Sequence, residues 1–311
     1  MQKTNKTKRI ETLSSERISS YHGGEHERKL YFTSDRYEVL SENYERPNGA
    51  ALKGYGLEIE TENWNIIDAN VYAYILEHLV LTCVSNDLFK KERDGSLCGG
   101  HTQAELITQI MTKEYIRNNY ANFKELFNRF EQIGTSCVRS GNCGMHVNIS
   151  VGCFGKSIET QDEAIRKLYY IVNHYYNQVC GLFARDIYHT SFCRQMETST
   201  FTIQDAKVVN YKRFGNDHGK CFNFSHNGRI ELRIVGGQKN YATFRNTMEC
   251  VFFLVQRVQK IGWKDLDNFI EIFRGCNQYV YSRLALLAEQ GYLPTRELNK
   301  ISDSIVREEY I

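Results

Sequence analysis

Three segments, far apart in the chain, alternate polar and apolar residues in the way that a β-strand with one buried face does. They are 56–62 (Gly-Leu-Glu-Ile-Glu-Thr-Glu), 144–150 (Gly-Met-His-Val-Asn-Ile-Ser) and 229–234 (Arg-Ile-Glu-Leu-Arg-Ile). Successive side chains of a strand point to opposite faces, so each segment would have one apolar face and one polar face. If the three strands pair, carboxylates, an imidazole and a guanidinium meet on one polar surface.

Apolar residues at helical spacing predict five helices around these strands. The first is capped by Asp68, the second follows Thr112, the third is capped at Thr160, and the fourth and fifth begin at Asn240 and Asp265. Thr160 and Glu163 have the spacing of a capping box, and the fifth helix should break near Gly275 and resume up to Glu289. Further strands are expected at 88–96, 103–109, 207–213 and 219–225, with one or two in 29–40.

The alternating strands argue against a purely parallel sheet buried on both faces, because such strands read as continuous apolar runs. We therefore expect an α+β fold with a curved, mainly antiparallel sheet, helices on its apolar face and an open polar face. We also expect a disordered tail over 1–20 and a single domain over 21–311. Within that domain the polar strands fall in 54–235 and a helical C-terminal part covers 240–311.

The composition narrows the choice of partners. The chain has 311 residues, 41% of them hydrophobic, and a net charge of +2, which argues against a dominant electrostatic partner such as nucleic acid. No apolar run reaches the roughly 20 residues of a membrane helix. The first ten residues lack the apolar core of a secretory signal, so we expect a cytoplasmic protein without a membrane partner. The ten cysteines show no Cys-x-x-Cys or zinc-finger spacing, and we interpret most of them as reduced, buried thiols.

Glu58 and Glu60 are the first candidate metal ligands. Side chains two residues apart on a strand are separated by roughly 6.5–7 Å. That spacing lets each carboxylate hold one of two divalent cations about 3.5–4 Å apart, the arrangement used in two-metal phosphoryl transfer. The alternative is a solvated strand face, since charged residues are mostly exposed.

Four further residues could complete such a site. His146 offers an imidazole, a common metal ligand, although many histidines are structural. Glu231 could bind metal while Arg233 meets phosphate oxygens, and the alternative is a simple ion pair. Glu105 is a carboxylate in an apolar strand, where a cation could serve as its partner, unless it lies exposed on an edge strand.

A glycine-rich segment at 152–157 resembles a phosphate-binding loop between a strand and a helix. The motif requires glycine six residues before its lysine, and that position is Ser150. The capping box at Thr160 also puts the helix start too late for Gly155 and Lys156 to lie in its first turn. We therefore reject a P-loop.

Taken together and in this order, the segments resemble the amidoligase family of the glutamine synthetase and glutamate–cysteine ligase superfamily. The matching elements, which lie within 54–235, are Gly56-Leu57-Glu58-Ile59-Glu60, Asp94-Gly95-Ser96-Leu97 followed by Glu105, Gly144-Met145-His146-Val147-Asn148, Phe183-Ala184-Arg185, and Asn223 leading into Ile230-Glu231-Leu232-Arg233. Many relatives have a second histidine where this chain has Asn148, and glycine–threonine where it has Gly228-Arg229. The resemblance does not extend to 1–50 or 240–311.

The resemblance implies a glutamine synthetase-like catalytic fold and an ATP-dependent ligase that joins a carboxylate to an amine through an acyl phosphate. By position, the Mg²⁺ ligands would be Glu58, Glu60, Glu105, His146 and Glu231, with Mn²⁺ as an alternative ion. Arg233 and Arg185 would act in catalysis. Asn148, Arg213 and Arg233 would contact the nucleotide or phosphate.

Two other functions stay open. A degenerate relative would bind metal or nucleotide as an interaction protein, without turnover. A nucleic-acid-binding protein would use the basic N-terminal residues, and its affinity should fall steeply with salt. The partners expected of a ligase are a carboxylate donor and an amine acceptor, small molecule or peptide, and the ends of the chain could set the acceptor or a homo-oligomer.

Overall fold

The computed structural model describes residues 28–33, 36–40, 52–84, 88–92, 102–138, 143–186, 193–198, 200–214, 219–226, 228–302 and 304–305. Its contacts divide the chain into two compact units. Unit 1 contains Met1–Glu42, Gly56–Met145 and Gly237–Tyr241, and unit 2 contains Asn43–Tyr55, His146–Gly236 and Ala242–Ile311. The tail predicted over 1–20 and the Asp94-Gly95-Ser96 motif lie outside the described residues, and the single domain stays a prediction.

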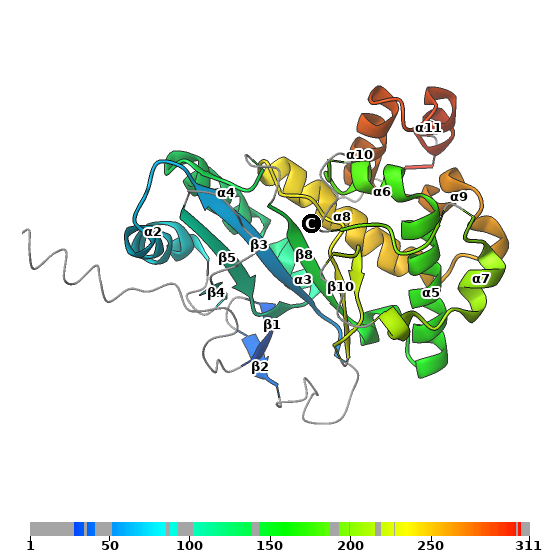
Figure 1. Ribbon diagram of the computed structural model, residues 1–311, viewed down its shortest axis with the longest axis horizontal. Helices are drawn as coiled ribbons and strands as arrows, with labels where there is room; N and C mark the ends of the chain where they lie inside the picture. Colours follow the sequence, from blue (N-terminus) through cyan, green and yellow to red (C-terminus); the bar gives the residue numbers. More distant parts are fainter. Residues whose placement is uncertain are drawn as a thin grey trace, which may run out of the picture. The chain divides into compact units, whose positions relative to one another are not determined.

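Unit 1 is built around strands that pair mostly antiparallel (Figure 1). They are β1 (Lys29–Thr33), β2 (Arg36–Val39), β3 (Tyr55–Asn63), β4 (Phe89–Glu92), β5 (Thr102–Thr108), β6 (Ile110–Met111) and β7 (Thr135–Ser136). β1 pairs antiparallel with β2 and parallel with β6. β5 pairs antiparallel with both β3 and β4, and β3 also pairs with β7. The α+β class and the predominance of antiparallel pairing are therefore confirmed for the described strands.

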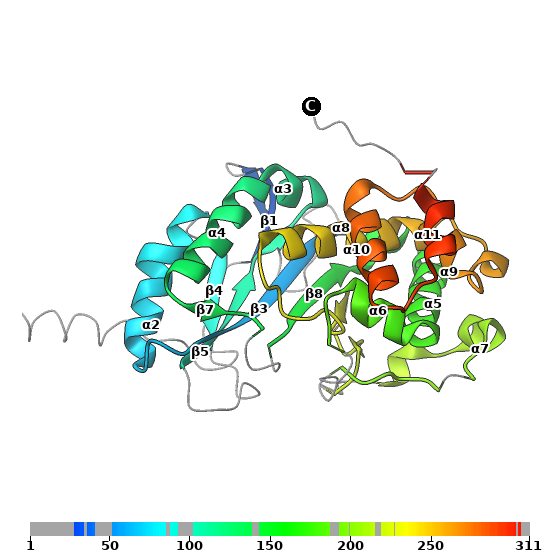
Figure 2. The same cartoon turned by 90° about the horizontal axis from the view of Figure 1, so that it is seen from above.

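Two helices of unit 1 start where the sequence predicts, although the one expected after Thr112 is divided in two at Asn119. Asp68 caps α2 (Ala69–Ile75) by accepting from the Asn70 amide at 2.7 Å, and the chain continues as π and 3-10 turns, η1 (Leu76–Val80) and η2 (Leu81–Cys83). Thr112 caps α3 (Lys113–Asn118), which is followed by α4 (Tyr120–Gln132). α2 packs against β5, α3 against β1 and α4 against β7 (Figure 2). Leu57 and Ile59, on the apolar face of β3, are fully buried.

Unit 2 combines three antiparallel strands with a helical region. Its elements are β8 (Met145–Ser150), η3 (Val151–Phe154), α5 (Ile158–His174), α6 (Tyr176–Leu182), α7 (Ile203–Val208), η4 (Tyr211–Phe214), β9 (Phe222–Asn223), β10 (Arg229–Leu232), α8 (Tyr241–Val258), η5 (Trp263–Asp265), α9 (Phe269–Phe273), α10 (Gln278–Glu289) and α11 (Thr295–Ser302). β10 lies between β8 and β9. The predicted break near Gly275 is confirmed, because α9 ends at Phe273, Arg274 has a ψ of 129° and Gly275 a φ of 75°, and α10 begins at Gln278.

Three sequence predictions in unit 2 are wrong. The capping box joins Ser157 and Thr160, so α5 begins a turn earlier than expected: Ser157 is itself a good cap and precedes the first helical residue. The strand expected at 207–213 is instead the end of α7 and a 3-10 turn, because Thr202 and Asp205 form a capping box upstream. The helix expected from Asp265 begins after Asn268, whose side chain accepts from the Ile270 amide.

The earlier start of α5 removes one of our two reasons for rejecting a phosphate-binding loop at 152–157. The other remains, because Ser150 stands where the motif requires glycine. In addition, Val151–Phe154 forms a 3-10 turn rather than a loop that could wrap around a phosphate.

Among the described residues, the helices include none that combines the length and apolar character needed to cross a membrane. The nine cysteines in this part of the chain are free thiols, and seven of them are buried. Burial raises the pKa of the Cys137, Cys180 and Cys276 thiols to about 12.

Candidate functional site

The carboxylates of unit 1 lie on the polar face shared by β3 and β5. Glu60 stands directly opposite Glu105 in the antiparallel register, and Glu58 is two positions away on the same face of β3. The exposed fractions of Glu60 and Glu105 are 4% and 3%, whereas Glu58 is half-buried. The sequence predicted an open polar face. The structure buries it, so each carboxylate needs a polar or cationic partner.

Glu60, on β3, makes two hydrogen bonds to Gly144, the residue just before β8. Its Oε2 accepts a hydrogen bond from the Gly144 amide, and its own amide donates to the Gly144 carbonyl at 3.1 Å. Gly144 and Met145 are the last residues of this stretch of unit 1, and His146 follows directly. At least one role of Glu60 is thus to position this backbone.

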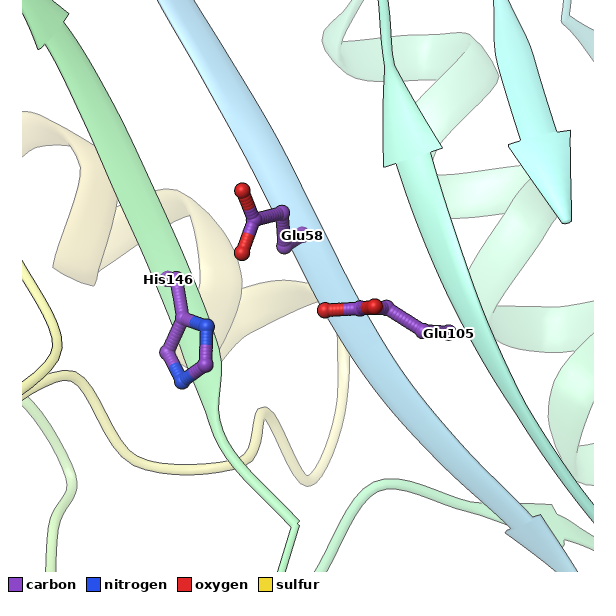
Figure 3. A group of neighbouring side chains, drawn as sticks. All are labelled: Glu58, Glu105 and His146. Atoms are coloured by element: carbon purple, nitrogen blue, oxygen red, sulfur yellow. The ribbon is translucent and has the colours of Figure 1, made fainter. Parts of the chain in front are cut away.

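Glu58, Glu105 and His146 form a group that could hold a metal ion (Figure 3). Each offers one ligand atom, and these atoms lie within 4.8 Å of one another. Two carboxylate oxygens and a ring nitrogen suit a divalent cation, and the charge of such an ion would offset the burial of Glu105. The donor set therefore fits the Mg²⁺ or Mn²⁺ that the sequence predicts.

Glu231, on β10 in unit 2, is the centre of a second group, and its exposed fraction is 3%. Its Oε1 accepts a hydrogen bond from Arg233 Nη1 and lies 3.4 Å from His146 Nδ1. Its Oε2 accepts from Asn223 Nδ2 at 2.8 Å and lies 3.8 Å from His226 Nε2. His146 therefore takes part in both groups, and the carboxylate of Glu231 has donors or ring nitrogens at both oxygens.

Asn223 is itself fixed in orientation by the loop that follows β9. Its Oδ1 accepts from the Ser225 amide at 2.9 Å and from Ser225 Oγ at 2.7 Å. With the carbonyl end occupied in this way, the amide nitrogen points to Glu231. The asparagine of the predicted motif is thus a group that orients the carboxylate.

Arg185 holds the backbone that continues from β10. Its buried Nη2 donates to the carbonyls of Arg233 at 3.2 Å and Val235 at 2.7 Å. The adjoining segments are closely fitted: Ala184 has a φ of 57°, and a Cβ on Gly236 would lie 2.2 Å from the Ala184 carbonyl oxygen. Arg185 therefore stabilises the backbone after β10 by hydrogen bonds to its carbonyls. The catalytic role expected of Arg185 stays a prediction.

Asn148 and Arg213 lie in different surroundings. Asn148 is buried on β8, directly opposite Glu231 in the register, and so shares its face. Arg213 lies on η4 with a side chain that is 60% exposed, 3.8 Å from Glu197 Oε1. Glu197 also accepts from the Tyr169 hydroxyl at 2.8 Å. Asn148 is therefore placed among the site residues, while the described contact of Arg213 is with this neighbouring carboxylate.

His226, beside Glu231, was not among the residues predicted from the sequence. It lies in the loop between β9 and β10, outside the alternating strands on which the prediction depended. The signal that could have found it is its position five residues before Glu231, where a tight turn can bring the loop back over the strand.

No protein-family model and no curated protein matches the chain. Among solved structures, the crystal structure of the complex between the prokaryotic ubiquitin-like protein Pup and its ligase PafA is similar with a TM-score of 0.31 and 9% sequence identity. The match covers 81% of this chain and 62% of that chain. At this level the likeness carries no argument about fold or function, and both must be argued from the residues themselves.

Proposed function

We propose that this protein is an ATP-dependent carboxylate–amine ligase with a glutamine synthetase-like catalytic fold, acting on a carboxylate donor and an amine acceptor. The observation that carries the proposal is the gathering of Glu58, Glu105 and His146, three side chains from three separate strands. The order of the sequence motifs supports it. Glu58, Glu105, His146 and Glu231, one from each of four motifs, belong to the two groups. Arg185, from the remaining motif, braces the backbone that follows β10.

The chemistry of such a ligase explains the residue types. A carboxylate is a poor electrophile, and transfer of the γ-phosphoryl group of ATP to it supplies a leaving group that an amine can displace. Divalent cations, when bound, neutralise the phosphate oxygens during that transfer. Glu58, Glu105 and His146 would hold such an ion, and Glu231 would hold a further one.

Arg233 would stabilise negative charge that develops on the transferring group. Its guanidinium is held by Glu231, so its position is fixed before substrate binds. Preorganisation of this kind is favourable because little reorganisation remains at the moment of reaction. Asn148, which shares the face of Glu231, would contact the nucleotide, and Arg213 would reach it from η4.

The test is Mg²⁺-dependent ADP release in the presence of amino acids, polyamines and glutamyl peptides. We expect Glu58→Gln and Glu231→Gln to reduce release by at least about a hundredfold, since each removes a charge that would hold a cation during phosphoryl transfer. Glu114→Gln and Glu289→Gln, at exposed positions, are the matched controls and should retain activity. Unfolding curves of all four variants would show whether the fold is retained.

If the wild-type chain releases no ADP with any donor and acceptor pair, the ligase proposal fails. Calorimetry with ATP and Mg²⁺ then identifies the alternative. Tight nucleotide binding without turnover would indicate a degenerate relative that works by binding.

A further inference from the structure

β2 is an outer strand of the sheet in unit 1, because among the described strands it pairs with β1 alone (Figure 1). Tyr31 of β1 stands opposite Tyr37 of β2, but the Tyr31 carbonyl accepts from the Thr112 amide at 2.9 Å and so points away from β2. Tyr31 and Tyr37 are therefore a non-hydrogen-bonded pair of this antiparallel ladder. Since the two kinds of pair alternate, the amides and carbonyls of Tyr37 and Val39 point to the outer edge.

The side chains of β2 extend an apolar row beyond the helix that covers β1. The ring of Tyr31, a residue that is 2% exposed, has its centroid 5.4 Å from that of Tyr115 on α3 and 5.4 Å from that of Tyr37. Tyr37 and Val39 share one face of β2, yet they are 46% and 45% exposed. The row therefore continues from a buried strand to an outer strand whose apolar side chains are in contact with solvent.

The second outer strand of unit 1 has a different composition. β4 pairs with β5 alone among the described strands, and it carries Lys90 and Lys91. Lysine on an outer strand hinders pairing with another chain, whereas exposed apolar side chains on such a strand favour it. On β2, Arg36 and Glu38 lie on the face opposite Tyr37. A positive and a negative charge two residues apart are complementary to the same two charges in reverse order.

We propose that β2 pairs antiparallel with β2 of a second copy of this chain, about a two-fold axis at Tyr37. In this register the two Tyr37 residues form a hydrogen-bonded pair through their outward backbone groups, and Arg36 lies opposite Glu38 twice. Opposite charges directly across an antiparallel pair are stabilising, whereas a shift by two residues would place Glu38 opposite Glu38. Charge complementarity thus favours both the second copy and this register. The inference goes beyond the proposed ligase function and does not depend on it.

The contact is small, because a strand of four residues buries far less than the roughly 1,200–2,000 Å² of a stable interface. We therefore expect a weak dimer, detected by sedimentation velocity of the full chain at concentrations up to about 0.5 mM. Val39→Pro removes an outward amide but no hydrogen bond to β1, and it should weaken dimerisation by at least about tenfold. Val39→Thr keeps the amide and the branched shape, so it should dimerise like the wild type.

Charge reversal tests the register. Arg36→Glu and Glu38→Arg each replace two attractive pairs by two repulsive ones, and each should weaken self-association by at least about tenfold. The double variant Arg36→Glu/Glu38→Arg restores the complementarity and should dimerise again. An equimolar mixture of the two single variants should form a mixed dimer, because each supplies the charge that the other lacks. Glu289→Arg, at an exposed position of unit 2, is the control for a change in net charge.

A wild-type chain that stays monomeric up to about 0.5 mM overturns the inference, and β2 is then free to pair with an extended segment of another protein. Single reversals that leave dimerisation unchanged, or a double variant that dimerises no better than either, overturn it as well. Urea unfolding of each variant checks the fold, and if Val39→Pro does not fold, the reversals at the surface decide alone. Dimerisation as expected without ADP release would refute the ligase and leave this inference standing.

Discussion

Replacing Arg185 separates a catalytic from a structural role for this residue. Its guanidinium is buried and donates to the carbonyls of Arg233 and Val235, at 3.2 Å and 2.7 Å. Arg185→Met keeps much of the side-chain volume but removes the charge and the hydrogen bonds of the guanidinium. Arg185→Lys keeps the charge but lacks the planar fork that reaches the carbonyls in a fixed geometry.

The loss in free energy of unfolding on replacing Arg185 can be calculated from these contacts. A hydrogen bond from a charged donor contributes about 1.5–3 kcal/mol, so the two well-placed bonds are worth about 3–6 kcal/mol. Removing the buried charge also removes its desolvation penalty, which offsets part of the lost hydrogen-bond energy. We expect Arg185→Met to lower the free energy of unfolding by about 3–5 kcal/mol and Arg185→Lys by about 1–3 kcal/mol. Out of a total of about 5–15 kcal/mol, either loss is readily measured.

The assay is urea unfolding followed by circular dichroism, together with hydrogen exchange. The Gly236 amide, which donates to the Phe183 carbonyl at 3.0 Å, should exchange faster in both variants because the segment that it closes is loosened. ADP release should fall in proportion to the loss of structure. If Arg185→Met unfolds within 1 kcal/mol of the wild type yet releases no ADP, the positioning role is wrong and the guanidinium acts on substrate.

Three further predictions concern other parts of the structure. Gly237→Ala should lower the free energy of unfolding by about 3 kcal/mol or more in a urea titration, because its Cβ would lie 1.6 Å from the Cys137 carbonyl oxygen. Gly275→Ala, with a φ of 75° and no atom within 4 Å of the added Cβ, should lower it by about 1–2 kcal/mol. Equal losses in the two variants would contradict the packing argument. Burial raises the pKa of Cys137, Cys180 and Cys276 to about 12 from an ordinary 9.0. Above pH 9 the unfolded chain therefore gives up protons that the folded chain retains, and the free energy of unfolding should fall as the pH rises from 9 to 12; a flat profile in urea titrations across this range would refute it. Mg²⁺ at a hundred times its Kd should raise the free energy of unfolding by about 2.7 kcal/mol. This gain should disappear in the Glu58→Gln/Glu105→Gln double variant. If the gain persists in the double variant, Mg²⁺ binds elsewhere.

The sequence was most informative where the pattern has a strict period. In β3, β8 and β10 the period of two fixes the face of every side chain, so Glu58, His146 and Glu231 could be assigned to one kind of surface from the sequence. Helix starts at Asp68 and Thr112 were equally predictable, because a capping side chain precedes an apolar periodic run. Periodicity and capping are local, and local rules suffice for these elements.

Predictions failed where two local rules competed. Ser157 and Thr160 are both acceptable caps, and the sequence does not say which one the backbone uses. The segment after Thr202 has apolar residues in a spacing that suits a short strand, but the capping box with Asp205 favours a helix. Burial of the polar face could not be predicted either, because the exposure of Glu60 or Glu105 depends on segments distant in the sequence.

The side chains of the site are oriented by groups that lie outside the strands carrying them. Each strand contributes a carboxylate or imidazole, but the groups that fix those side chains come from backbone and loops: the Gly144 amide at Glu60, and Asn223 with Ser225 at Glu231. Fixed donors leave a buried carboxylate little freedom to turn, so the protein alone determines its position. A motif therefore identifies the carboxylates and the imidazole, whereas the donors that orient them follow from tertiary contacts. His226 fits the same logic, since a loop residue gains its place beside Glu231 only after β9 and β10 have paired.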